Sequence, residues 1–347
     1  MALAHCIESN PDSFDVVHAR TLHRFPDLVA SLNGDADALM SHAGICTDAE
    51  SRITYRQISH LLETAAATFH CPDFGMRLAQ LQGGGLFGPL GSAMRNSRTF
   101  GEAIDYVCTH SYAHSLAARI TCNRRPEDGR AFMSHDILLD GIANRAQLME
   151  QTLLVGHLTA MEMTGGHARA WQVHFRHQPI SAAKTYRRNF GCEVLFGLSQ
   201  DGVVYANCSL DSPILAPNAE TYRTVTAFID ERFTRHVPPL HAQVRGIVVR
   251  LLQSESCTSE CIASELNMHI RTLHRKLKGE GTTFQKIKDE VRCDLMLYYL
   301  RQTDLDFTHI SERLGFAEQS VLTRSCSRWL AASPTVIRAE ARQHRHA

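Results

Sequence analysis

The sequence of 347 residues lacks long apolar runs, and none approaches the roughly 18 residues that a membrane-spanning helix needs. Its first residues, MALAHCIESNPDS, have no basic flank and no apolar stretch long enough for a signal peptide. The eleven cysteines include no CxxC pair, so we expect reduced, mostly buried thiols. Together these absences predict a cytoplasmic protein that does not contact a membrane.

The common catalytic and metal-binding motifs are also missing. GGGLFG (83–88) lacks the GK[ST] of a phosphate-binding loop and is expected to form a turn, and neither HExxH nor GxSxG occurs. His110 and His114 lie four residues apart, on one face of an expected helix, but two ligands are too few for a metal site. We therefore expect no cofactor, no metal and no enzymatic activity. The alternative of an enzyme whose N-terminal domain acts chemically on its ligand stays open.

Charge of one sign is not in excess, because 36 Lys and Arg residues balance 36 Asp and Glu residues. The charge is unevenly distributed, however. Residues 241–347 contain 16 basic and 12 acidic residues, whereas the remainder contains 20 basic and 24 acidic ones. The C-terminal part therefore carries the basic surplus that a partner with negative charge would require.

A proline pair marks the boundary between two domains. HVPPLHAQ (236–243) interrupts any helix, since proline lacks the backbone donor and restricts the residue before it. We place a linker at 232–243, between an N-terminal domain at 1–231 and a C-terminal domain at 244–347.

Helical and strand patterns are mixed in the N-terminal domain, which predicts an α+β fold. RQISHLLETAAATF (56–69) and residues 141–163 have helical periodicity. A hairpin is expected between 116–123 and 130–138, and strands at 171–177 and twice within 194–206. By contrast, the C-terminal domain is expected to be all helical, with helices at 243–254, 258–266, 270–279, 283–302, 307–314, 318–330 and 334–343.

Two stretches of the C-terminal domain resemble each other. CIASELNMHIRTLHRKL (261–277) recurs in weaker form as HISERLGFAEQSVLTRSCSRW (309–329). Each copy is typical of a short helix, a tight turn at Asn267 or Gly315, and a second helix. This is the helix-turn-helix pattern, in which the second helix enters a major groove of DNA.

The second helix of each copy is two-sided. The expected buried stripes are Ile270, Leu273 and Leu277 in the first copy and Leu322, Cys326 and Trp329 in the second. The residues expected to face base edges are Arg271, His274 and Arg275 in the first copy and Gln319, Ser320, Thr323 and Arg324 in the second. Arg suits guanine and Gln suits adenine, whereas Lys278 and Arg328 are expected to hold phosphates.

At this point the sequence resembles the AraC-type transcription regulators. IASELNMHIRTLHRKLKGEGTTF, EVRCDLMLYYLRQTDLDFTHISERLGFAEQSVLTRSCSRW and SPTVIR follow that family's DNA-binding domain over about 245–340. The resemblance implies two helix-turn-helix units joined by a rigid helix at about 283–302, which read successive major-groove segments. Four positions depart from the family. His269 replaces a usual serine N-cap, Ala331 replaces a usual glycine after the last recognition helix, and Leu322 and Cys326 replace phenylalanines of the common pattern.

The N-terminal domain is similar to one branch of this family. CPDFGMRLAQLQGGGLFGPLG, VHFRHQP and YRRNFGCEVLFG resemble the "arabinose-binding-like" domain, shared by a mycobacterial virulence regulator and the ornithine-utilisation regulators. The resemblance implies a regulator of transcription, more typically an activator, that binds double-stranded promoter DNA and RNA polymerase. It further implies a small-molecule effector, whose site the sequence does not identify, and a homodimer. The alternative is a ligand-independent regulator whose N-terminal domain only dimerises or binds another protein.

Overall fold

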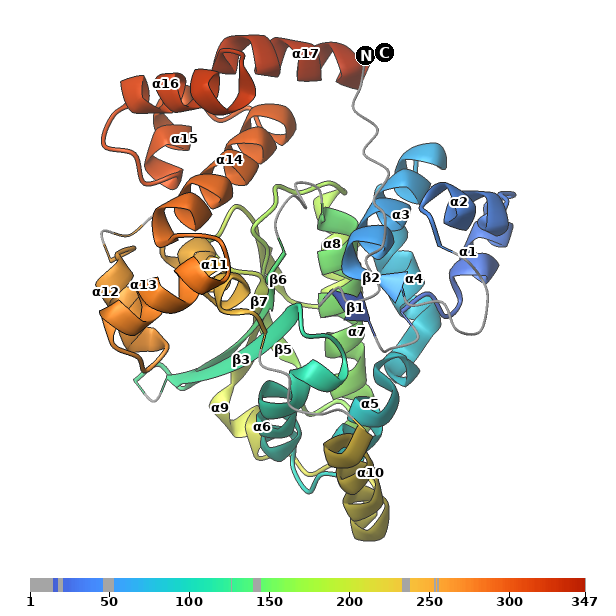
Figure 1. Ribbon diagram of the computed structural model, residues 1–347. Helices are drawn as coiled ribbons and strands as arrows, with labels where there is room; N and C mark the ends of the chain where they lie inside the picture. Colours follow the sequence, from blue (N-terminus) through green and yellow to red (C-terminus); the bar gives the residue numbers. More distant parts are fainter. Residues whose placement is uncertain are drawn as a thin grey trace. The chain divides into compact units, whose positions relative to one another are not determined.

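The computed structural model describes residues 15–17, 21–45, 53–125, 127–139, 145–232, 238–252, 254 and 256–346 (Figure 1). Its contacts divide the chain into two compact units. The first comprises residues 1–137 and 145–237, and the second comprises residues 138–144 and 238–347.

The first unit is built on a five-stranded sheet with the order β3-β4-β7-β5-β6. The strands are β3 (Ala118–Arg125), β4 (Arg130–Ile137), β5 (Ala170–His174), β6 (Glu193–Leu195) and β7 (Gly202–Ala206). β3 and β4 form the expected hairpin, and every neighbouring pair is antiparallel except β5 and β6, which run parallel. A two-stranded sheet pairs β1 (Val16–Val17) with β2 (Ile53–Thr54).

Helices cover one face of this sheet, which we call its inner face. α6 (Phe100–His110) packs on β3 and α7 (Ala146–Met163) on β7, while α5 (Gly88–Arg95) packs on α6. The other helices are α1 (Phe25–Ser31), α2 (Ala36–His42), α3 (Tyr55–Thr68), α4 (Phe74–Gln82), α8 (Ala183–Phe190), α9 (Asn207–Leu210) and α10 (Ala219–Arg232). The expected α+β class is therefore confirmed.

Local sequence signals explain several of these helices. Thr54 begins α3 with a capping box: its hydroxyl accepts from the Gln57 amide at 3.2 Å, and the Gln57 side chain accepts from the Thr54 amide at 3.0 Å. Thr99 caps α6 through its hydroxyl, which accepts from the Glu102 amide.

One expectation for this unit is wrong. GGGLFG was expected to be a turn, but residues 83–87 form a 3-10 helix, η1, and α5 follows at once from Gly88. Gly83 and Gly88 adopt positive φ angles of 55° and 53°, so the glycines bend the path between consecutive helices. The helix expected at 141–163 is found as α7, and residues 141–144 lie outside the described residues.

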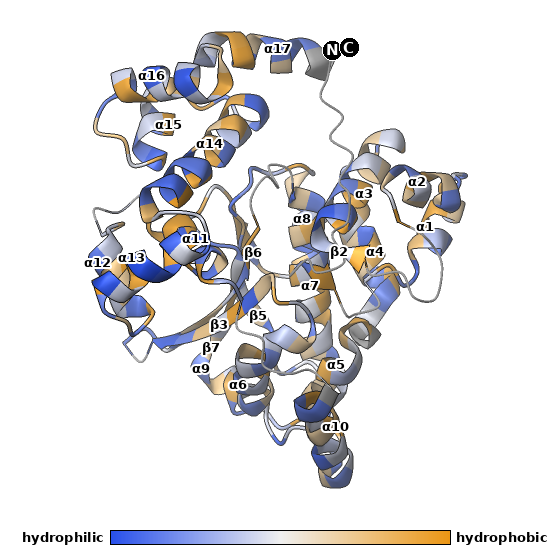
Figure 2. Ribbon diagram, viewed as in Figure 1, coloured by the Kyte–Doolittle hydropathy of each residue, from blue (hydrophilic) through white to orange (hydrophobic). Residues whose placement is uncertain are grey.

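The second unit is all helical, as expected (Figure 2). Its helices are α11 (Leu240–Leu251), α12 (Ser259–Glu265), α13 (Ile270–Gly279), α14 (Phe284–Gln302), α15 (Phe307–Arg313), α16 (Gln319–Leu330) and α17 (Pro334–His346). One apolar cluster joins all seven, from Val244 of α11 to Ile337 of α17. α10 extends to Arg232, and α11 begins at Leu240 directly after the proline pair, so the linker expected at 232–243 overlaps the ends of both helices.

Candidate DNA-binding surface and ligand cavities

The first helix-turn-helix unit consists of α12 and α13. The Thr258 hydroxyl caps α12 by accepting from the Cys261 amide at 3.2 Å. Asn267 then takes a left-handed conformation (φ 50°) that redirects the chain, a conformation Asn tolerates better than most residues. α13 begins after His269, whose ring Nδ1 accepts from the Arg271 amide at 3.2 Å. His269 thus supplies the capping hydrogen bond that the usual serine of this family would supply at the same position.

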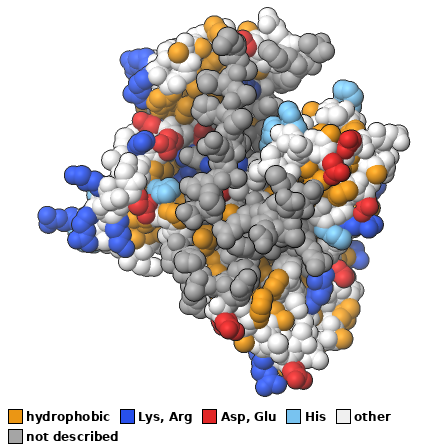
Figure 3. Space-filling model, turned by 45° about the vertical axis from the view of Figure 1, so that its right-hand side comes forward, with side chains coloured by type: hydrophobic (Ala, Val, Ile, Leu, Met, Phe, Trp, Pro, Cys, Tyr) orange, Lys and Arg blue, Asp and Glu red, His pale blue; other side chains and the backbone are white. Residues whose placement is uncertain are grey.

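α13 has one buried and one polar face. Leu273 and Leu277 are fully buried, and Ile270 is half-buried against the same cluster. The four residues expected to face DNA from this helix are exposed: Arg271, His274, Arg275 and Lys278. Figure 2 shows α13 as largely hydrophilic, and Figure 3 shows Lys and Arg side chains standing out at the height of α12 and α13. In the described part of the chain no carboxylate forms an ion pair with Arg271, Arg275 or Lys278, so their charges are available to an anionic partner.

The second helix-turn-helix unit consists of α15 and α16. Asp306 caps α15 by accepting from the His309 amide at 2.8 Å. Gly315 makes the turn at φ 62°, and a Cβ at this position would lie 2.2 Å from the carbonyl oxygen of Leu252. Only glycine satisfies both the left-handed backbone and this close approach.

The exposed and buried faces of α16 match the sequence expectation. Leu322 and Cys326 are fully buried, and Trp329 packs on Phe316 with the ring centroids 6.3 Å apart. The outer face carries the exposed residues Gln319, Ser320, Thr323 and Arg324.

Several of these outer side chains have local hydrogen bonds. The Thr308 hydroxyl lies 3.2 Å from Gln319 Oε1, and Ser320 donates to Glu318 at 3.0 Å. Arg328 is exposed but lies 3.7 Å from Asp289 of α14, with its guanidinium over the Trp329 ring. A phosphate at Arg328 would therefore compete with a carboxylate.

Two basic residues of α14, which the sequence reasoning did not single out, connect α14 to the helix-turn-helix units. Lys288 donates to the Cys257 carbonyl, just before α12, at 2.7 Å. Arg292 donates to the carbonyls of Leu314 (2.9 Å) and Gly315 (2.6 Å), and its guanidinium lies 4.5 Å from the Phe316 ring. Lys288 and Arg292 are four residues apart, which places both side chains on one face of α14. This spacing is the only feature of the sequence from which their shared role could have been predicted.

A small apolar cavity of about 60 Å³ lies in the first unit between the inner face of the sheet and helices α5, α6 and α7. Its lining includes Met133 and His135 of β4, Tyr205 of β7 and Gly156 of α7. The Nε2 atom of His135 and the hydroxyl of Tyr205 are buried, and neither has a hydrogen-bond partner within the described residues. Burial lowers the pKa of His135, which keeps its ring neutral.

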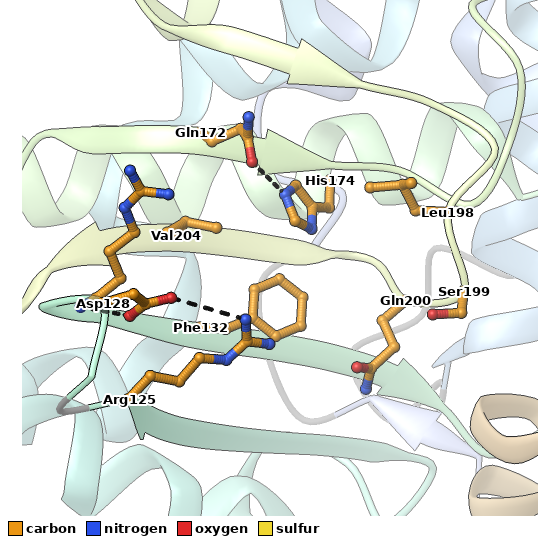
Figure 4. A pocket seen from close by; sticks show the side chains of 10 residues that line it. Arg125, Asp128, Phe132, Gln172, His174, Leu198, Ser199, Gln200 and Val204 are labelled. Carbon is orange, nitrogen blue, oxygen red and sulfur yellow. Dashed lines mark hydrogen bonds and ion pairs between the residues drawn. The ribbon is translucent and has the colours of Figure 1, made fainter.

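A second pocket, of about 300 Å³, lies on the outer face of the same sheet (Figure 4). Its lining mixes polar and apolar side chains, and several of the polar groups already have partners. Arg125 lies 3.9 Å from Asp128, and His174 Nε2 lies 2.6 Å from the Gln172 oxygen. The His174 ring also lies 5.2 Å from that of Phe132.

The histidine pair considered for a metal is separated by the fold. α6 ends at His110, and the 3-10 turn η2 (Ser111–Ala113) precedes His114, so the two do not share a helix face and that expectation is wrong. His110 Nδ1 bonds to the Tyr106 carbonyl oxygen at 2.9 Å, and His114 Nε2 bonds to the Tyr55 hydroxyl at 2.7 Å.

Over the described ranges, no helix is both long and apolar enough to cross a membrane.

Comparisons with known proteins match both units. Residues 34–214 match the family described as the arabinose-binding domain of AraC transcription regulator, N-terminal, and residues 262–340 match a helix-turn-helix domain family. The transcriptional regulator VirS of Mycobacterium tuberculosis is 31% identical over 92% of this chain and 89% of its own length. The ornithine utilization regulator of Pseudomonas aeruginosa is 24% identical over 90% and 93%, respectively.

Among solved structures, the transcriptional regulator CdpR of Pseudomonas aeruginosa aligns with a TM-score of 0.46 and 19% identity, over 92% of this chain and 97% of that one. The curated relatives named above are regulators and not enzymes, and the identity to VirS extends over both units. The chain therefore belongs to the AraC-type transcription regulators that carry the arabinose-binding-like N-terminal domain.

Proposed function

We propose that this regulator activates transcription in response to a small molecule sensed by its N-terminal domain. α13 and α16 read successive major-groove segments of promoter DNA, and the bound complex recruits RNA polymerase. Because the target is chromosomal DNA, the regulator works in the bacterial cytoplasm, and a second copy of the chain is its expected partner. The N-terminal domain comprises residues 1–231, and the DNA-binding domain residues 244–347.

The observation that carries the proposal is the pair of exposed polar faces on α13 and α16. Arg271, His274 and Arg275 contact base edges from α13, while Lys278 holds a phosphate. Gln319, Ser320, Thr323 and Arg324 contact base edges from α16, and Arg328 holds a phosphate. All nine side chains are exposed, and each face is backed by buried leucines. Arg and Gln form two hydrogen bonds each with guanine and adenine edges, which gives sequence preference.

The proposal is tested by fluorescence anisotropy on the DNA upstream of the gene and on unrelated DNA, over a series of salt concentrations. Arg275→Ala should cost about 1–3 kcal/mol on the upstream DNA and relax the preference at one base position. Lys278→Ala should weaken binding to both DNAs equally and lower the salt dependence.

Lys276 provides a matched control. It is exposed on the same helix but is turned about 100° from Arg275, away from the reading face. Lys276→Ala removes one charge and should not change the preference for any base. If Arg275→Ala and Lys276→Ala weakened binding by the same factor on every DNA, α13 would not be the helix that contacts base edges.

Effector control is tested separately by thermal unfolding in the presence of a panel of metabolites. A ligand at 100 times its Kd stabilises the native state by about 2.7 kcal/mol. If no metabolite raises the Tm while DNA binding is intact, the N-terminal domain serves only dimerisation or protein contact.

A further inference from the structure

The cavity under the sheet has a lining suited to one kind of molecule. Strand alternation and the pairing of Met133 with Val203 bring β4 and β7 side chains to the same inner face. The helices add apolar side chains, among them Leu90, Met94 and Ile104, and no Lys, Arg, Asp or Glu lines the cavity. The space is therefore apolar on most sides.

Two polar atoms in this lining need a partner. His135 Nε2 and the Tyr205 hydroxyl are buried without a hydrogen bond in the described part of the chain. Tyr205 is fully inaccessible to solvent, and His135 is 8% exposed. Buried polar groups in native proteins nearly always have a partner, so two such groups lining one cavity indicate an occupant that supplies it.

The helix that closes the cavity leaves room for an occupant. Gly156 lies in the interior of α7, where glycine is less favourable than alanine. A Cβ at this position would have no heavy atom within 4 Å, and Gly156 lines the cavity. The absence of a side chain at Gly156 therefore leaves space in an otherwise close-packed core.

We propose that this cavity is the effector site and that it takes a small uncharged molecule with an apolar body and one hydroxyl or carbonyl group. The assignment rests on the proposed control of this regulator by a small molecule. Tyr205 and His135 would bind the oxygen, and the methionines and aliphatic side chains would contact the body.

Charge and size define the ligand further. A carboxylate or an ammonium group would lose its hydration without meeting a Lys, Arg, Asp or Glu side chain, because none lines the cavity. Of the two histidines in the lining, His135 is neutral, and the Nε2 atom of His114 is already hydrogen-bonded to the Tyr55 hydroxyl. The volume of about 60 Å³ is less than half of the ~150 Å³ that accepts benzene in an engineered apolar cavity. In the same proportion to the six heavy atoms of benzene, an alcohol or aldehyde of about one or two carbons is the corresponding size. The outer pocket, with Arg125 and Arg130, would suit an anion instead.

The test uses the full chain with ¹³C-methyl-labelled methionine and titration with ethanol. Met94 and Met133 line the cavity, whereas Met296 is buried in the second unit and serves as internal control. We expect saturable shifts of the Met94 and Met133 methyl signals and an unchanged Met296 signal. Formate and methylammonium, of similar size to ethanol but charged, should leave all three signals in place.

Two variants locate the site. Gly156→Val places a side chain in the cavity and should abolish the shifts. Tyr205→Phe should weaken ethanol binding about 3- to 10-fold, the effect of one neutral hydrogen bond. In the unliganded protein Tyr205→Phe should raise the Tm, because it removes a buried hydroxyl without a partner. Arg130→Ala, which alters the outer pocket and does not touch the inner cavity, should leave ethanol binding unchanged.

Anisotropy on the upstream DNA separates failure of this inference from failure of the regulatory function. If the protein binds that DNA but ethanol causes no saturable shift, or shifts survive in Gly156→Val, the cavity assignment is overturned and DNA binding stands. Saturable shifts without preference for the upstream DNA would support the cavity and contradict the regulator. Shifts caused by formate and lost in Arg130→Ala would move the site to the outer pocket.

Discussion

A buried glutamate in α7 makes the stability of the first unit depend on pH. The Glu150 side chain is fully inaccessible to solvent, and its Oε1 accepts from the Tyr186 hydroxyl at 2.5 Å. The Tyr186 oxygen in turn accepts from the amides of Ile180 and Ser181. Burial raises the pKa of Glu150 to about 8. The Nε2 atom of His177 lies 3.8 Å from Glu150 Oε1, but burial lowers the pKa of His177, so its ring does not supply a compensating positive charge.

The direction and size of the effect follow from this pKa. In the unfolded chain a glutamate loses its proton near pH 4.5, whereas native Glu150 keeps it up to about pH 8. Between these values the unfolded state binds fewer protons than the native state, so the free energy of unfolding falls as pH rises. The slope is about 1.4 kcal/mol per pH unit, which amounts to about 5 kcal/mol over the whole window, as an order of magnitude.

Glu150→Gln removes the titration and keeps an oxygen that can accept from Tyr186. We expect the variant and the wild type to be about equally stable near pH 4.5, and the variant to be several kcal/mol more stable at pH 8. Urea unfolding at several pH values measures this difference. In a Trp329→Phe background, Trp171 is the single tryptophan and reports on the first unit alone.

Glu220→Gln is the matched control, because Glu220 is exposed on α10 and its replacement should not change the pH dependence. If Glu150→Gln and the wild type gave parallel curves of stability against pH, Glu150 would not titrate in this window and the reasoning would be refuted.

Three further predictions concern the second unit. Arg292→Ala should lower the free energy of unfolding by about 2–3 kcal/mol and weaken DNA binding, because the carbonyls of Leu314 and Gly315 lose charged donors; unchanged urea midpoints would contradict this. Ala331→Gly should stabilise by about 0.5–1 kcal/mol, since Ala331 ends α16 at φ 53°, and a lower Tm would argue against strain there. Gly315→Ala should cost about 3 kcal/mol or more, because its Cβ would meet the Leu252 carbonyl; circular dichroism at 37 °C would show whether the helices survive.

The sequence predicted the second unit well because its signals are local. Each of its helices was expected within a few residues of its position. The turns at Asn267 and Gly315 were expected, and both have left-handed backbone conformations. Periodicity alone distinguished the buried Leu273 and Leu277 from the exposed Arg275, since a helix fixes which residues share a face.

The first unit was harder to predict because its strands pair over long sequence distances. The two short strands expected within 194–206 exist, but β6 pairs in parallel with β5, and β7 lies between β4 and β5. A pattern of alternating residues identifies a strand without identifying its neighbours. Likewise, five glycines in residues 83–91 suggested a turn, whereas packing of Leu86 and Leu90 into the core holds this stretch helical.

The same reasoning explains why the effector site could not be found in the sequence. His135 and Tyr205 are 70 residues apart, and each occurs in a strand in which a histidine or tyrosine is unremarkable. They line one cavity because β4 pairs with β7 in a register that places Ala131 opposite Tyr205 and Met133 opposite Val203. A shift of one residue would turn one of the two polar groups to the outer face. The DNA-reading faces each lie within one helix, whereas the cavity depends on the register of the sheet.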